Sequence, residues 1–280
     1  VTANLLEGKV AVLTDGTPFA LEMPMIFISF LQAVEDYYQN WILVFGLRIL
    51  RLIGFLVALL LPSIYVALTT YHQEMLPTSL AVSLAIQREQ VPYPAVVEAL
   101  VMQIVFEILV EAGLRLPKPL GQAVSIVGAL VIGEAAVRAG LISAAMVIVV
   151  SATAISSFLF PAYGLSLAIR LLRIPMIVLS ASLGLFGIFM GLLLIMIHLV
   201  NLRSFGVPYL AGVAPFVPES QGDIIIRAPW WKMIRRPKIT GFEDPIREVE
   251  GLKPGSNIKG RGDLKELEAE VTDKERQKKK

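Results

Sequence analysis

The chain has 280 residues, 55% of them hydrophobic, and a formal net charge of +2 at pH 7. This apolar share exceeds that of ordinary soluble domains, and the mean hydropathy of +0.69 favours a membrane protein. The absence of cysteine excludes disulfides, thiolate metal sites and cysteine nucleophiles, and two histidines are too few for a histidine metal cluster. We therefore expect no metal or other cofactor.

Charge is segregated along the chain. The first 200 residues hold only 9 of the 25 Lys and Arg and 11 of the 23 Asp and Glu, so the last 80 carry the other 16 and 12. The chain thus has a charge-poor body and a highly charged, slightly basic tail. It begins with Val1 rather than Met and shows no signal-peptide pattern there, so we expect it to be the C-terminal part of a longer protein.

Residues 1–26 carry a hairpin pattern. Apolar and polar residues alternate between Leu6 and Pro24 on both sides of the pair Asp15-Gly16, which favours a tight turn between two strands. A lone hairpin is marginal in water. We therefore expect a β-hairpin that belongs to an upstream soluble domain.

Residues 27–51 combine aromatic and charged side chains ahead of the first long apolar run. Aromatic side chains gather at membrane–water boundaries, so this segment is predicted to be one interfacial amphipathic helix. Glu35 and Asp36 are expected to face water within it.

Residues 52–202 are predicted to form the transmembrane domain. Arg48 and Arg51 precede its first apolar run and place that end on the cytoplasmic side by the positive-inside rule. Gly164–Arg173 is a short basic amphipathic stretch expected on the membrane surface. The segments long and apolar enough to cross are Leu52–Tyr71, Pro94–Leu114, Leu141–Phe160 and Ile174–Leu202.

A fifth apolar segment, Gly121–Val137, decides whether the number of membrane crossings is odd or even. Five full crossings starting inside would put the basic tail outside, whereas four crossings and one re-entrant segment return it to the cytoplasm. Pro117, Pro119 and Gly121 open the segment, which favours the re-entrant reading. The expected fold is an all-α polytopic membrane bundle of about four crossings plus this re-entrant segment.

Ionisable residues within these apolar segments are the candidate functional groups. Glu107, Glu111 and Arg115 lie at i, i+4 and i+8 on one helix face, and Glu134 and Arg138 repeat the i, i+4 spacing. They are either ion pairs that fix helix packing or the charged lining of a water-filled path. No motif decides between these alternatives.

Hydroxyl side chains, among them Ser151 and Thr153, are unusually frequent in the segment Leu141–Phe160. Such groups in membrane helices serve packing and backbone bonding more often than ion binding. We include Ser151 and Thr153 with the candidate pore or buried polar residues.

Residues 203–240 form a membrane-proximal segment rich in cations and aromatics. Trp230, Trp231, Arg235 and Arg236 suit anionic lipid headgroups at a cytoplasmic membrane face. Single-stranded nucleic acid could use the same chemistry, but beside a membrane domain we expect none. Residues 241–280 mix both charge signs without a core and are predicted to be a frayed helix or disordered.

Several runs resemble the A subunits of the GerA family of spore germinant receptors. The most specific part surrounds Gly133-Glu134-Ala135-Ala136, and together the runs cover roughly residues 6–238. The chain departs from the family pattern in lacking the upstream soluble region and in its longer C-terminal extension. The similar runs are DGTPFAL (Asp15–Leu21), FLQAVEDYY (Phe30–Tyr38), LPKPLGQAVSIVGALVIGEAAVRAG (Leu116–Gly140), VPYLA (Val207–Ala211) and RAPWWKM (Arg227–Met233).

The resemblance implies a nutrient-sensing subunit in the inner membrane of an endospore, with N- and C-terminal parts on the cytoplasmic side. In that family the A subunit works with a transporter-like B subunit and a lipoprotein C subunit. It is thought to oligomerise, as a ring, and to form an ion-conducting path that opens on sensing. The family supplies no catalytic residue to carry over.

The residues themselves leave several functions open. A signalling channel subunit fits the Gly-, Ala- and Ser-rich helices, which pack closely around a symmetry axis. A secondary transporter or substrate carrier is the alternative, although no inverted pair of interrupted helices is visible. An enzyme is not expected, because no His–carboxylate, Ser–Lys or Cys–His arrangement lies at matched depth. A purely structural anchor is disfavoured by the buried carboxylates.

Overall fold

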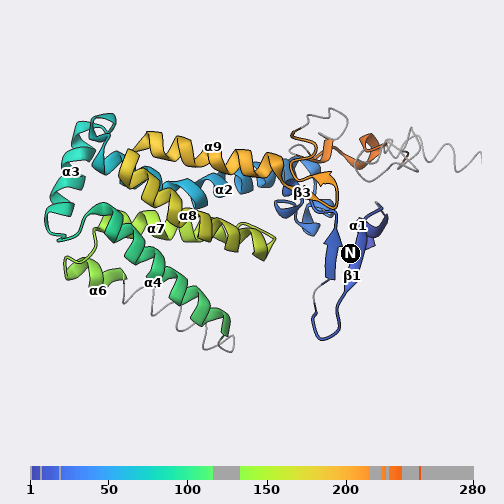
Figure 1. Ribbon diagram of the computed structural model, residues 1–280, viewed down its shortest axis with the longest axis horizontal. Coiled ribbons are helices and arrows are strands. Elements are labelled where there is room, and N and C mark those ends of the chain that lie inside the picture. Colours follow the sequence, from blue (N-terminus) through green and yellow to red (C-terminus); the bar gives the residue numbers. More distant parts are fainter. Residues whose placement is uncertain are drawn as a thin grey trace, which may run out of the picture. The chain divides into compact units, whose positions relative to one another are not determined.

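The computed structural model describes residues 2–6, 8–18, 20–115, 133–214, 222–224, 227–234 and 246. The chain divides into two units, Val1–Arg227 and Ala228–Lys280. The first unit is mostly helical, as expected (Figure 1). In the second unit, the described residues include the short 3-10 helix η6, Trp230–Lys232.

The N-terminal hairpin is confirmed. After the helix α1 (Thr2–Leu6), strand β1 (Val10–Leu13) pairs antiparallel with β2 (Ala20–Met23), with Val10 opposite Met23. Gly16 lies in the connection with φ +83°, a backbone conformation that glycine adopts without a steric penalty. That this hairpin belongs to an upstream soluble domain stays a prediction.

The predicted single helix over residues 27–51 is wrong. Two short 3-10 helices, η1 (Phe27–Phe30) and η2 (Val34–Tyr37), come first, and α2 then runs from Trp41 to Thr70. The Asn40 side chain accepts a hydrogen bond from Ile42 N at 3.0 Å and so caps the start of α2. Arg48 and Arg51 therefore lie inside the long apolar helix rather than ahead of it.

The remaining helices follow α2 in the order η3, α3, α4, α6, α7, α8 and α9. Helix α2 packs against α7 and α8, and α9 lies along α8 and α2 (Figure 1). Two short strands, β3 and β4, pair after α9. The bounds are η3 Gln73–Met75, α3 Thr78–Glu89, α4 Ala95–Arg115, α6 Gly133–Arg138, α7 Ala144–Ser157, α8 Tyr163–Leu183, α9 Leu185–Asn201, β3 Arg203–Ser204 and β4 Val207–Pro208.

Two helices in the described part of the chain, α2 and α8, are long and apolar enough to cross a membrane. Helices α7 and α9 are apolar but shorter, and α4 carries three carboxylates. The structure thus supports membrane association, while the number of four crossings stays a prediction. Most of the expected re-entrant segment Gly121–Val137 lies outside the described residues.

The predicted single span Ile174–Leu202 is wrong, because the chain turns back at Gly184. This glycine has φ +63° and ψ −141°, and a Cβ there would lie 2.6 Å from His72 Cε1 and 3.0 Å from Tyr71 Cβ. Both the backbone angles and the close neighbours require glycine. Helix α8 ends there, and α9 runs back along it.

The bundle has two ends, which we name by a buried carboxylate at each. At the Glu98 end, the Tyr71 hydroxyl after α2 donates to the carbonyl of Ser182 near the end of α8, at 2.9 Å. At the Asp36 end, Phe27 N donates to the carbonyl of Tyr209, beyond α9, at 2.8 Å. The segments before α2 and after α9 therefore lie at the same end of the bundle.

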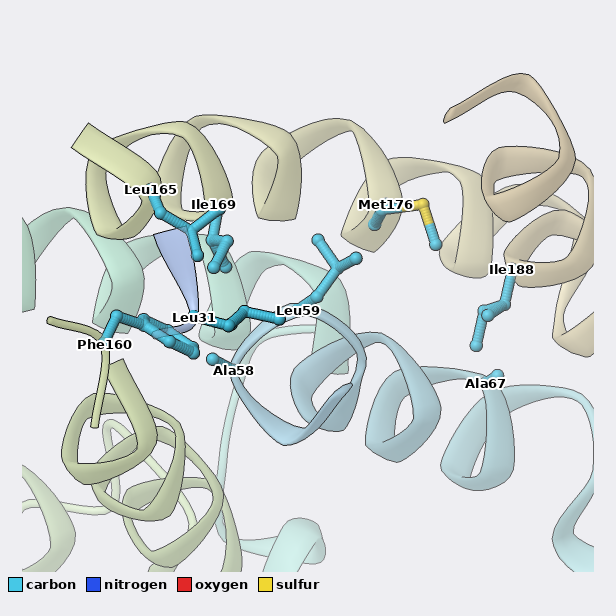
Figure 2. Close-up of a cluster of buried hydrophobic side chains, with 9 residues drawn as sticks. All are labelled: Leu31, Ala58, Leu59, Ala67, Phe160, Leu165, Ile169, Met176 and Ile188. Atoms are coloured by element: carbon cyan, nitrogen blue, oxygen red, sulfur yellow. The ribbon is translucent and has the colours of Figure 1, made fainter. Parts of the chain in front are cut away.

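The apolar core lies between α2 and α8. Figure 2 shows Leu165 and Ile169 of α8 directed toward the part of α2 that carries Ala58 and Leu59, while Met176 extends toward Ile188 of α9. A second apolar cluster joins α2 to α4 and α7, with Val66, Ala99 and Met146 at its centre. Small residues such as Ala58, Ala67 and Ala99 allow the helices to approach closely.

Replacing Gly184 by alanine tests the helix break. We expect Gly184→Ala to destabilise the protein by about 2 kcal/mol or more, because the new Cβ meets His72 and Tyr71 and the backbone is strained. Gly46→Ala is the matched control, since no atom lies within 4 Å of a Cβ at this helical position. Thermal unfolding in detergent would measure both. Equal melting temperatures for the two variants would contradict the conclusion that the turn between α8 and α9 requires glycine at position 184.

Candidate functional site

Arg173 of α8 is the most deeply buried cation in the described part of the bundle, with no exposed surface. Its Nε donates to the carbonyl of Ala58 at 2.7 Å, Nη1 to Gln103 Oε1 at 2.8 Å and Nη2 to Ser157 Oγ at 3.1 Å. These acceptors belong to α2, α4 and α7. One guanidinium therefore contacts three neighbouring helices, and every acceptor is neutral.

The Ala58 carbonyl is free to accept because of Pro62. In an α-helix, the carbonyl of residue 58 would bond to the N–H of residue 62, but proline has none. A buried carbonyl without a partner is costly. Arg173 supplies the missing donor, so the proline of α2 and the arginine of α8 satisfy one hydrogen-bonding requirement together.

Arg170 lies one turn before Arg173 and pairs with a carboxylate. Its Nη1 is 2.8 Å from Glu107 Oε1 on α4, and its Cζ lies 5.8 Å from the centre of the Tyr163 ring. Arg170 is 6% exposed, whereas the Glu107 side chain is 42% exposed. The Arg170 Nε is buried and has no hydrogen-bond partner within the described residues.

The prediction that Gly164–Arg173 lies on a surface is therefore wrong. The stretch forms the first half of α8, and its two arginines share the inward helix face with Leu165 and Ile169. The stretch is amphipathic, as predicted. Its polar groups meet acceptors on α2, α4 and α7 instead of water or lipid headgroups.

Glu98 of α4 is a buried carboxylate that contacts the start of α7. Its Oε1 accepts hydrogen bonds from Ser143 N at 2.5 Å and from Ser143 Oγ at 2.6 Å. Ser143 also caps α7, and the Tyr65 hydroxyl lies 3.5 Å from its Oγ. Glu98 is 1% exposed, and its Oε2 has no hydrogen-bond partner among the described residues.

Asp36 was expected to face water, and this is wrong, because it is 1% exposed. Arg51 holds both carboxylate oxygens, with Nη1 at 2.6 Å and Nη2 at 2.7 Å, and Arg48 Nε lies 3.5 Å away. Burial raises the pKa of Asp36, but hydrogen bonds from Arg51 and from Ala33 N, with the charges of both arginines, hold it below its usual value. Glu35 is exposed, as predicted.

The same cluster joins a later segment to the start of α2. Arg48 Nη2 lies 3.0 Å from Asp223 Oδ1, and the Tyr37 hydroxyl donates to Asp223 Oδ2 at 2.9 Å. The Arg227 guanidinium lies over the Tyr37 ring, with Cζ 4.6 Å from the ring centre. Charges from distant parts of the sequence therefore fix the Asp36 end of the bundle.

The predicted site residues divide among several elements. Glu107 and Glu111 lie one turn apart on α4, and Glu111 is exposed. Glu134 and Arg138 form an ion pair at 2.6 Å on α6, with side chains 54% and 79% exposed. The structure thus brings Glu107 to Arg170 and Glu134 to Arg138.

The hydroxyl candidates of α7 have different surroundings. Ser151 is exposed. Thr153 is buried, and its Oγ1 donates to the carbonyl of Val149 at 2.7 Å, which is the backbone bonding that the sequence favours. Neither the exposure of Ser151 nor the hydrogen bond of Thr153 assigns the residue a role in a pore.

The membrane-interface candidates are only partly described. Trp230 and Trp231 belong to η6, while Arg235 and Arg236 lie outside the described residues. Their contact with lipid stays a prediction. Among the residues that the structure describes, no three His, Asp or Glu side chains gather where they could hold a metal ion.

Sequence reasoning missed Arg173, Arg170, Gln103 and Glu98 as site residues. One signal was available for Arg173, because Pro62 in a long apolar helix leaves a carbonyl without its donor. Burial of the other three depends on neighbouring helices, which a single sequence does not locate.

The mostly helical fold and the two candidate spans in the described part of the chain indicate a membrane-associated protein. Over residues 1–239 it matches the family described as Bacillus/Clostridium GerA spore germination protein. The chain belongs to this GerA family, as its sequence motifs predicted.

Three relatives illustrate the similarity. Spore germination protein KA of Bacillus subtilis (strain 168) is 51% identical over 254 residues, which cover 91% of this chain and 47% of that protein. Uncharacterized membrane protein YfkQ of the same strain is 53% identical over 237 residues, or 85% of this chain and 46% of that protein. Spore germination protein GerLA of Bacillus cereus is 43% identical over 244 residues, or 87% of this chain and 50% of that protein.

The chain spans about half the length of the curated relatives it matches. No solved structure matches it.

The Asp36 cluster generates a stability prediction. Asp36→Asn removes the carboxylate that Arg51 and Arg48 share, and we expect a loss of about 3 kcal/mol because the buried cations lose their partner. Glu35→Gln, at the exposed neighbouring position, is expected to change stability by less than about 0.5 kcal/mol. Denaturant unfolding in detergent would compare them. A similar stability for both variants would show that the cluster is not structural.

Proposed function

We propose that this chain is the membrane-embedded part of a germinant receptor subunit, which triggers spore germination in response to a nutrient. Membership of the GerA family supports this proposal, as does similarity to relatives named spore germination proteins. The subunit works with the transporter-like B subunit and the lipoprotein C subunit of the same receptor. Nutrient binding elsewhere in the complex shifts an equilibrium in this subunit.

The proposed output is an ion-conducting path formed by several copies of the subunit arranged in a ring. The observation that carries this proposal is the charged face of α4. Glu107 is 42% exposed and Glu111 is exposed on a helix whose other exposed residues, such as Val101 and Ile108, are apolar. Carboxylates facing lipid would be costly, so this face meets protein or water.

A path between subunits fits this bundle better than a path within one. Its interior is filled by the apolar clusters and by Arg173, which is fully buried. The candidates to line the path are Glu107, Glu111, Glu134, Arg138 and Ser151, whereas Thr153 is buried inside the bundle.

The proposed location is the inner membrane of the spore, with both ends of the chain on the cytoplasmic side. Met25 N donates to Ser204 Oγ at 3.2 Å, and Phe27 N to the Tyr209 carbonyl, so the segments before α2 and after α9 meet at one end. Arg48 and Arg51 at that end agree with the positive-inside rule. Trp230, Trp231, Arg235 and Arg236, which precede the charged tail 241–280 in the sequence, would contact anionic lipid at the cytoplasmic face.

Single cysteines on α4 test the conducting path, since the chain has none of its own. Positions 107 and 111 would be replaced in the intact receptor and treated with a membrane-impermeant thiol reagent, before and after addition of a complex nutrient broth to spores. We expect labelling at both positions, faster by about fivefold or more after nutrient. Cysteine at Met102, which is 7% exposed, is the buried control.

The labelling pattern also shows which face of α4 is in contact with water. Spores that germinate normally yet show no labelling at either position would contradict a water-filled path along α4. The carboxylates would then be packing ion pairs, and the signal would leave through other parts of the chain.

A further inference from the structure

The facing surfaces of α4 and α8 carry charges at matching intervals. On α4, Gln103, Glu107 and Glu111 follow one another every four residues, which places them on one helix face. On α8, Arg170 and Arg173 are three residues apart. Because Gln103 meets Arg173 and Glu107 meets Arg170, the two helices run antiparallel.

In this register the charges are imperfectly matched. Arg173, fully buried, meets only neutral acceptors, while the carboxylate of Glu107 pairs with the less deeply buried Arg170. A fully buried cation is costly when all the acceptors that it contacts are neutral, even though its hydrogen bonds are made. Arg170 Nε and Glu98 Oε2 are among the buried side-chain atoms that have no hydrogen-bond partner within the described residues.

We propose that α4 has a second register, displaced by four residues, about 6 Å along the helix axis, toward the Glu98 end. In that register Glu107 meets Arg173 and Glu111 meets Arg170, so each arginine faces a carboxylate. Because four residues exceed one turn of 3.6 residues, the displacement includes a rotation of about 40°. One-turn displacements of this kind form two-state switches in other helical proteins.

The same displacement relieves Glu98. It would carry this side chain away from Ser143 and toward the α3–α4 connection. Arg88 of α3 lies in that direction, since its Nη1 donates to the Thr69 carbonyl at 3.4 Å, one turn beyond Tyr65 on α2. The Arg88 Nε is buried and has no hydrogen-bond partner within the described residues. A carboxylate and a cation that both lack a full set of partners thus come closer together.

The packing of α4 tolerates the displacement. Ala99 takes the place of Ala95, and both are fully buried alanines. Gln103 takes the place of Ala99 and Met102 that of Glu98, and methionine is the side chain best able to repack. Val101, Ile104 and Ile108 lie on the face of α4 opposite Ala95 and Ala99. They are exposed, so packing on that face does not fix the position of α4 along its axis.

The two registers give the subunit a switch that links its two ends, because α4 moves as a rigid element. A change at the Glu98 end would displace Arg115 by one turn at the other end. The inference concerns this equilibrium alone and holds whether or not the assembled receptor conducts ions.

Labelling of a buried cysteine tests the second register. Ala95→Cys lies at the start of α4 with no exposed surface, and it emerges from the bundle when the helix moves toward the Glu98 end. The probe is a membrane-impermeant maleimide, applied to the intact receptor in its native membrane. Gln103→Glu gives Arg173 a carboxylate in the observed register, and Glu111→Gln removes one from the displaced register. Each should slow labelling of Ala95→Cys by about fivefold or more.

Two exposed positions of α3 provide the controls. Gln87→Glu and Glu89→Gln make the same chemical changes near the reporter but off the α4–α8 interface, and they should leave the labelling rate unchanged. The inference is overturned if Ala95→Cys is never labelled, or if Gln103→Glu and Glu111→Gln label at the rate of the parent or faster. Glu111→Gln alters an exposed side chain and so keeps the test valid even if Gln103→Glu folds poorly.

Discussion

The bundle depends on one hydrogen-bonded cation in an apolar interior. Arg173 reaches the Ala58 carbonyl, Gln103 and Ser157, so a single side chain of α8 joins α2, α4 and α7. Pro62 makes this possible, because it removes the donor that the Ala58 carbonyl would otherwise have. Apolar contacts between helices lack direction in lipid, since lipid tails are as apolar as leucine. Directed hydrogen bonds from one guanidinium therefore specify which helices meet.

The two ends of the bundle are fixed by different means. At the Asp36 end, Arg48 and Arg51 hold a buried carboxylate and bring in Asp223 from far along the chain. At the Glu98 end, the connections are tight turns such as Gly184, and a carboxylate caps the start of α7. The Asp36 carboxylate is held by two arginines, whereas the Glu98 carboxylate keeps one buried oxygen without a hydrogen-bond partner among the described residues. That difference favours movement at the Glu98 end and rigidity at the other.

Features encoded locally were predictable from the sequence. The hairpin was found from Asp15-Gly16 and the alternation around it, and the GerA family from motifs such as those around Gly133. The helices α2, α4 and α7 were recognised because a continuous apolar stretch is a local property of the sequence. Pattern and composition alone suffice for such features.

Features that depend on distant partners were not predictable. Asp36 was placed in water because nothing beside it in the sequence shows that Arg51, fifteen residues later, turns back to it. Arg170 and Arg173 form an amphipathic pattern that fits a membrane surface as well as a protein interior, and only the neighbouring helices decide. Gly184 was one glycine in a long apolar run, and the turn there became apparent from its contacts with His72 and Tyr71.

The most direct test of this account is the stability of Arg173→Lys, measured by denaturant unfolding in detergent. Lysine keeps the positive charge but cannot reach acceptors on three helices at once, since its ammonium is a single compact donor group. The account predicts a loss of about 2–4 kcal/mol, because buried acceptors lose a charged donor. Unfolding at the denaturant concentration of the parent chain would contradict it, and the helices would then be held in place by their apolar contacts alone.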